Sequence, residues 1–87
     1  MADGSIALAS DRISQLVRGL LAKRNIMVAP EPSADLRRCG LTSLDMVNLM
    51  LAVEAQFDIE IPQSEMTPEN FRSIASIDAV VKKLVPA

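Results

Sequence analysis

The chain has 87 residues, of which 49% are hydrophobic and 2% aromatic, and its formal net charge is −2. This length allows one small domain, predicted over residues 1–87 with residues 1–4 flexible, and it excludes a large enclosed active site. The apolar runs are shorter than the roughly 18 residues that a membrane span requires. The N-terminus lacks the positive segment of a signal peptide, and the single cysteine, Cys39, cannot form an internal disulfide, so we expect a protein of the reducing cytoplasm.

The first predicted helix runs from about Ser5 to Arg24. Lys23 and Arg24 lie in its last turn, where cations complement the helix dipole, and Asn25 can end it. The helix is predicted because its apolar residues recur at intervals of three and four, which is the pattern of one buried face: Ile6, Ala9, Ile13, Leu16, Val17 and Leu20.

A long connection is predicted over residues 26–42, since Pro30 and Pro32 exclude a regular helix there. A turn is possible over residues 33–37. Gly40 supplies backbone freedom just before the next helix. The connection is expected to pack across the helices because apolar residues occur along it, among them Ile26, Val28, Leu36, Cys39 and Leu41.

The second long helix is predicted from Ser43 to about Phe57. Thr42 and Asp45, just at its beginning, have the spacing of a capping box. In that arrangement each side chain accepts a hydrogen bond from the backbone N–H of the other residue. Thr42 is therefore the predicted helix cap.

Two further helices are predicted nearer the C-terminus. A short one of about one turn is expected over Thr67–Phe71, because Thr is a good cap and Pro68 suits the first helical position. The last helix begins near Ser73, and its apolar stripe is Ile74, Ile77, Val81 and Leu84. The sequence therefore predicts an all-α fold: a small four-helix bundle of three main helices and one short helix, with a long loop between helices one and two.

The predicted helix over residues 43–57 has apolar residues on two faces. One face suits the core and contains Met46, Leu49, Met50, Val53 and Phe57. The other contains Leu44, Val47, Leu51 and Ala55. Either both faces are buried because the helix is central, or the second face stays partly exposed and binds partner proteins. The second interpretation predicts a partner-binding surface made of Leu44, Asp45, Val47, Asn48, Leu51 and Glu54.

The residue types exclude most enzyme chemistry. With no histidine and one cysteine, Cys39, the chain has no Ser–His–Asp or Cys–His arrangement, no zinc site and no internal disulfide. Its acidic residues do not match a calcium loop. We therefore predict no catalytic residues and no metal. From Ser43 to Asn70 there are acidic residues but no Lys or Arg, which favours basic protein partners over nucleic acid.

The segment Gly40-Leu41-Thr42-Ser43-Leu44-Asp45 resembles the signature of acyl carrier and peptidyl carrier proteins, which is Gly-x-Asp-Ser-Leu. Two later segments, 57–62 and 70–77, are also similar to this family, so the resemblance covers nearly the whole chain. It implies that Ser43 carries 4′-phosphopantetheine, a covalent group derived from coenzyme A, whose thiol holds acyl or aminoacyl groups as thioesters. The implied partners are a phosphopantetheinyl transferase, an acyl- or aminoacyl-loading ligase and downstream transferases, and the carrier is expected to be a monomer.

Two features depart from the usual pattern of the family. Thr42 replaces the usual Asp, and Asn48, Ala55 and Gln56 occupy a helix that is rich in Glu in fatty acid synthase carriers. The chain is therefore more similar to specialised free-standing carriers, some of which receive amino acids. The alternatives are an unmodified helical adaptor that binds partners through Leu44, Val47 and Leu51, or an enzyme, which the residue types disfavour.

Overall fold

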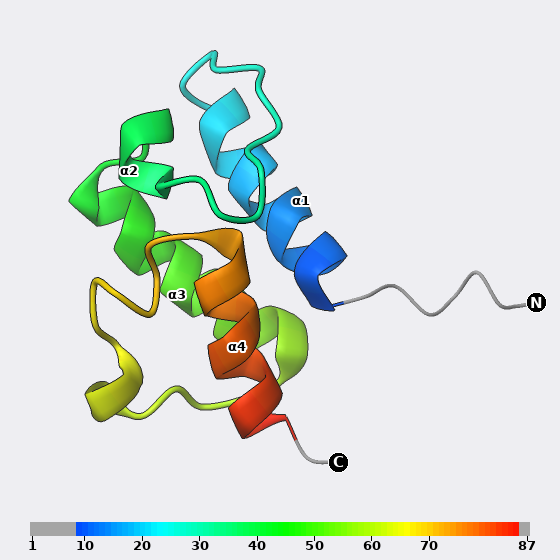
Figure 1. The fold of residues 1–87 in the computed structure, drawn as a ribbon, viewed down its shortest axis with the longest axis vertical. Coiled ribbons are helices and arrows are strands. Elements are labelled where there is room, and N and C mark those ends of the chain that lie inside the picture. Colours follow the sequence, from blue (N-terminus) through cyan, green and yellow to red (C-terminus); the bar gives the residue numbers. More distant parts are fainter. Residues whose placement is uncertain (1–8, 86–87) are drawn as a thin grey trace, which may run out of the picture.

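The computed structural model describes residues 9–85, which form helices connected by loops and contain no strand (Figure 1). The helices are α1 (Ala9–Ala22), α2 (Leu36–Cys39), α3 (Ser43–Phe57), the 3₁₀ helix η2 (Gln63–Glu65) and α4 (Ile74–Leu84). Helix α1 packs against both α3 and α4. The predicted all-α bundle is confirmed: three main helices, α1, α3 and α4, are accompanied by one short α-helix, α2, and by the 3₁₀ helix η2. None of the helices within residues 9–85 is both long and apolar enough to cross a membrane.

The first helix ends two residues earlier than predicted, at Ala22. Asn25 adopts a left-handed conformation with φ of 62°, and the Ile26 N–H donates to the Leu21 carbonyl at 2.9 Å. This pattern is a Schellman motif, which satisfies carbonyl groups at a helix end. Asn25 therefore ends α1 as predicted, while Arg24 lies beyond the helix. The predicted start at Ser5 and the predicted flexibility of residues 1–4 lie outside the described residues.

The short helix is not where the sequence predicted it. Residues 67–71 form a turn in which the Thr67 hydroxyl accepts the Asn70 N–H at 3.2 Å. The turn cannot continue as a helix because Ser73 has the extended backbone of a new N-cap, with φ of −142°. The short helix is α2 instead, in the long connection. Asp35 caps its beginning.

Gly40 ends α2 in a backbone conformation that only glycine adopts readily. Its φ is 126°, which strains any residue that has a Cβ. A Cβ built there would also lie 2.5 Å from the Ile26 Cδ1 atom. Glycine at this position therefore permits both the turn into α3 and the close packing of Ile26.

The long connection is attached to the beginning of α4. The Leu36 N–H donates to the Arg72 carbonyl at 2.8 Å, and the Ala75 N–H donates to the Pro32 carbonyl at 2.9 Å. Leu36 and Leu41 are buried, as predicted, but Val28 is half exposed. The connection therefore packs on the bundle through its second half and fixes α2 beside the start of α3.

The core lies where α1, α3 and α4 meet. Each helix buries residues that are three or four positions apart, so each contributes one stripe. The fully buried side chains are Ile13, Val17, Leu21, Leu36, Leu49, Val53, Phe71, Ile77 and Val81. Phe71 is the largest of them, and it comes from the loop before α4.

Candidate functional site

The beginning of α3 is held by Thr42 and Asp45. The Thr42 hydroxyl accepts the Asp45 N–H at 3.1 Å, and the Asp45 carboxylate accepts the Thr42 N–H at 2.9 Å. This is the predicted capping box, and such a cap stabilises a helix by about 1 kcal/mol. The cap is thus confirmed as Thr42, and Ser43 becomes the first residue of the helix.

Ser43 is exposed to solvent. Within residues 9–85 its hydroxyl makes no hydrogen bond to the protein, since Thr42 provides the cap. The first N–H groups of a helix lack intrahelical acceptors, and the helix dipole favours negative charge there. An exposed hydroxyl in this position can be esterified without breaking any contact in the fold, and a phosphate ester on it would lie in a favourable electrostatic field.

Arg24 reaches the same helix start from the end of α1. Its guanidinium group donates through Nε and Nη2 to the two carboxylate oxygens of Asp45, and through Nη2 to the Thr42 hydroxyl at 3.3 Å. The Asp45 side chain is only 11% exposed. These contacts, led by the hydrogen bond from Arg24 and followed by the one from the Thr42 N–H, lower the pKa of Asp45 to about 2.

This pairing makes the stability of the protein depend on pH in acid. The pKa of Asp45 is lower in the folded chain than its ordinary value of 3.8, so its ionised form stabilises the fold above that value. The stabilisation is lost as the pH falls from 3.8 to about 2. In urea unfolding, we expect wild type to be more stable than Asp45→Asn at neutral pH, with the difference shrinking over this range. A difference that stays constant with pH would contradict the assignment.

The two apolar faces of α3 have different environments. On the core side Leu49 and Val53 are fully buried. On the other side Leu44, Val47 and Leu51 are 67%, 49% and 56% exposed. The structure therefore agrees with the second interpretation of this helix, in which one apolar face remains open. We call Leu44, Val47 and Leu51 the outer face of α3.

Two of the polar residues predicted to contact partners also make contacts inside the fold. Asp45 is bonded to Arg24 and Thr42, and Glu54 accepts the Ile61 N–H through one oxygen of its carboxylate at 2.7 Å. Asp45 is nearly buried and Glu54 is partly exposed, and their contact with a partner stays a prediction. Asn48 is exposed and remains available beside the outer face.

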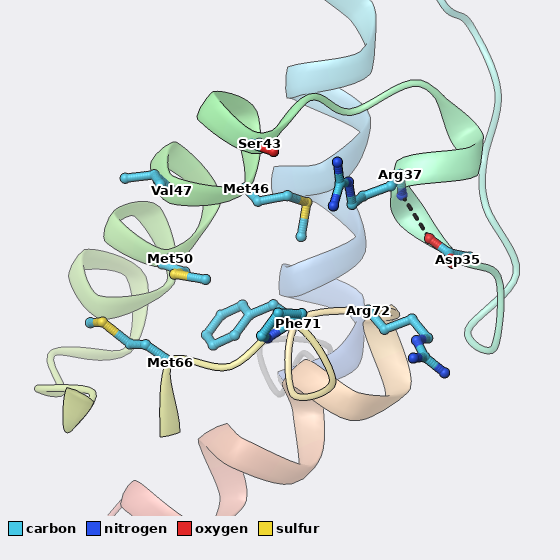
Figure 2. A pocket seen from close by; sticks show the side chains of 10 residues that line it. Asp35, Arg37, Ser43, Met46, Val47, Met50, Met66, Phe71 and Arg72 are labelled. Carbon is cyan, nitrogen blue, oxygen red and sulfur yellow. Dashed lines mark hydrogen bonds between the residues drawn. The ribbon is translucent and has the colours of Figure 1, made fainter. Parts of the chain in front are cut away.

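An apolar groove of about 340 Å³ starts at Ser43. Figure 2 shows three methionine side chains, from Met46, Met50 and Met66, gathered around Phe71. The Arg37 side chain extends from α2 toward Met46 and the start of α3, whereas the guanidinium of Arg72 points away (Figure 2). The groove is lined by Asp35, Arg37, Ser43, Met46, Val47, Met50, Met66, Pro68, Phe71 and Arg72. Sequence reasoning did not identify this groove, because its residues come from three separate segments, 35–37, 43–50 and 66–72.

The residues at the start of α3 fit a phosphopantetheine group. The group needs a free hydroxyl, which Ser43 supplies, and surroundings that tolerate a phosphodiester. Of the charged residues that line the groove beside Ser43, Arg37 extends toward the start of α3, whereas the Arg72 guanidinium points away (Figure 2), and Asp35 accepts the Arg37 N–H. In the part of the chain that the structure describes, no cluster of acidic and cysteine side chains could hold a metal ion.

Comparisons with known proteins show the family of this chain. The family model described as the phosphopantetheine attachment site matches residues 11–81. Aminoacyl carrier protein 1 of Bradyrhizobium diazoefficiens is 51% identical over 78 residues, which cover 88% of this chain and 87% of the relative. Aminoacyl carrier protein 2 of the same organism is 42% identical over 71 residues, which cover 82% of this chain and 80% of the relative.

A solved structure is also similar over most of this chain. It is a carrier protein bound to the glycine:[carrier protein] ligase of Bradyrhizobium japonicum, with an analogue of glycyl adenylate. The match has 50% sequence identity and a TM-score of 0.73, and it covers 85% of this chain and 96% of the other. The chain therefore belongs to the phosphopantetheine-binding carrier proteins, which hold acyl or aminoacyl groups on that prosthetic group.

Proposed function

We propose that Ser43 carries the phosphopantetheine arm and that the cargo of the arm is an aminoacyl group. One observation supports attachment at Ser43. This residue is exposed at the start of α3, and the cap of that helix is already provided by Thr42. Thr42 is the less suitable attachment point, because its hydroxyl accepts hydrogen bonds from Asp45 and Arg24 that an ester would disturb.

Attachment of the arm is a phosphoryl transfer from coenzyme A. The Ser43 oxygen forms a bond to the phosphorus that bears pantetheine, the diphosphate P–O bond breaks, and adenosine 3′,5′-bisphosphate leaves. The hydroxyl proton passes to a base of the phosphopantetheinyl transferase or to water, since this chain has no histidine. The carrier contributes only the hydroxyl, so we propose that it is not itself an enzyme.

The cargo proposal rests on the relatives, which are named aminoacyl carrier proteins. An aminoacyl adenylate is suited to load the arm. The thiolate attacks its carbonyl carbon, a C–S bond forms, the C–O bond to phosphate breaks and AMP leaves. Because a thiol of this kind has a pKa near 8.5, the ligase must favour the thiolate or supply a strongly activated acyl group. We propose such a ligase, and transferases that accept the cargo, as partners of the outer face of α3. The cytoplasmic location and the monomeric state remain predictions.

Intact mass measurement tests the attachment site. Wild-type protein coexpressed with a promiscuous phosphopantetheinyl transferase should gain the mass of one phosphopantetheine, and Ser43→Ala should gain none. Ser64→Ala is a matched control, because Ser64 is also exposed but lies in η2, and it should be modified like wild type. Unmodified wild-type protein, or arm on Ser43→Ala, would refute the proposal.

The cargo is tested on the modified protein. A glycine:[carrier protein] ligase with ATP and labelled glycine should transfer label to wild-type protein, and hydroxylamine should release the label because the bond is a thioester. Label that resists hydroxylamine, or no transfer with any amino acid while a fatty acyl ligase loads the arm, would overturn the aminoacyl proposal.

A further inference from the structure

The contact between Arg24 and the start of α3 joins two distant parts of the chain beside the modified residue. Arg24 and Asp45 are 21 positions apart, and their side chains form a two-pronged ion pair. The longer of these two bonds, from Nη2 to Oδ1, measures 3.1 Å. The same nitrogen reaches the Thr42 hydroxyl. Arg24 thus contacts both residues of the capping box, Thr42 and Asp45, which lie on either side of Ser43 in the sequence.

An exposed ion pair alone adds little to stability, because water screens it. This one differs because its acidic partner is nearly buried, while Arg24 remains 42% exposed. The planar guanidinium group holds a carboxylate in one orientation, which a lysine ammonium cannot do. The carboxylate in turn accepts the Thr42 N–H at 2.9 Å. The orientation of the backbone just before Ser43 therefore depends on Arg24.

We propose that Arg24 is a positioning residue for arm attachment, which holds the Thr42–Asp45 turn so that the Ser43 hydroxyl is presented in one fixed geometry. This inference rests on the proposed attachment at Ser43. Without the guanidinium group, Asp45 loses both charged hydrogen bonds and the turn has more conformations. Because a transferase must align the hydroxyl with a phosphorus atom, misalignment lowers the rate of the chemical step. The outer face of α3 is not altered, so binding of the transferase should change little.

The test is the steady-state rate of arm attachment to unmodified protein by a purified phosphopantetheinyl transferase. We expect Arg24→Gln to lower kcat about tenfold, equivalent to about 1.4 kcal/mol in activation free energy, with KM nearly unchanged. Arg24→Lys, which keeps the charge but not the planar fork, should fall between wild type and Arg24→Gln. Amide hydrogen exchange of Thr42 should accelerate in the same order.

Two control variants separate positioning from general stability. Ile77→Val removes one methylene from the core on α4, and Lys82→Gln breaks the exposed ion pair with Asp78 at 2.9 Å. Both should accept the arm at the wild-type rate. If Arg24→Gln also accepts the arm at the wild-type rate, the inference is wrong. It is also wrong if Ile77→Val is slowed as much as Arg24→Gln. In both cases Ser43 can still be the attachment site. If wild type itself gains no arm, the proposed attachment site fails instead.

Discussion

Replacing Leu51 with aspartate is expected to lower kcat/KM for aminoacyl loading by at least about a hundredfold and to leave the fold intact. Leu51 is 56% exposed on the outer face of α3, so the charge remains in water in the free protein. In a complex, the same carboxylate would be buried against an apolar partner surface without a counter-ion, which costs several kcal/mol. A factor of a hundred corresponds to about 2.7 kcal/mol.

Two control variants separate a specific effect at the outer face from an effect of added charge or of unfolding. Gln15→Asp adds the same charge on an exposed position of α1 and should load like wild type. Leu49→Asp, only two residues away on the buried face, should unfold the protein because its charge enters the core. Circular dichroism checks folding, and transfer of labelled amino acid by the ligase measures loading. If Leu51→Asp loads normally, the outer face does not bind the ligase; if it unfolds, that face is part of the core.

Replacing Phe71 with alanine is expected to destabilise the protein by about 3–5 kcal/mol, the usual cost of truncating a buried aromatic residue. Phe71 is 1% exposed and is the largest fully buried side chain. It also lines the groove beside Ser43, together with three methionines that lie on one side of it (Figure 2). Domains are stable by only about 5–15 kcal/mol, and the smallest bury the least surface. The loss should therefore be a large share of the total.

Urea unfolding followed by circular dichroism measures this effect. The matched control is Phe57→Ala, because Phe57 is only partly buried, at the end of α3, and should cost markedly less. Melting temperature should fall by about 4–8 °C for each kcal/mol in a domain of this size. If Phe71→Ala and Phe57→Ala lower the free energy of unfolding equally, Phe71 contributes no more to the core than Phe57.

Local chemistry in the sequence was sufficient to predict α3 and α4. Their beginnings are set by hydroxyl caps at Thr42 and Ser73, whose hydrogen bonds involve residues only three positions away. The end of α1 at Asn25 is also local, since it requires one residue that tolerates a left-handed backbone. The motif that we propose as the attachment site is contiguous as well, so Ser43 could be proposed without a structure.

The short helix shows where local signals were insufficient. The Thr67 cap and Pro68 favour a helix at residues 67–71, yet only a turn forms there. Phe71 is anchored in the core and Ser73 starts α4, so the chain has no room to continue the turn. Helix α2 depends on Gly40, whose positive φ ends it after four residues. Residues 67–71 and residues 36–39 each had a weak local preference for a short helix, and contacts with the rest of the fold determined that only residues 36–39 form one.

The sequence by itself determined the main helices and the Thr42 cap, and it pointed to the serine that we propose carries the arm, because each depends on neighbours along the chain. Only the tertiary structure decided whether the second apolar face of α3 is open or buried, because exposure depends on where α1 and α4 pack. It also decided that Asp45 pairs with Arg24. That pairing joins residues 21 positions apart, and no periodicity or motif in the sequence encodes a contact between side chains that only folding brings together.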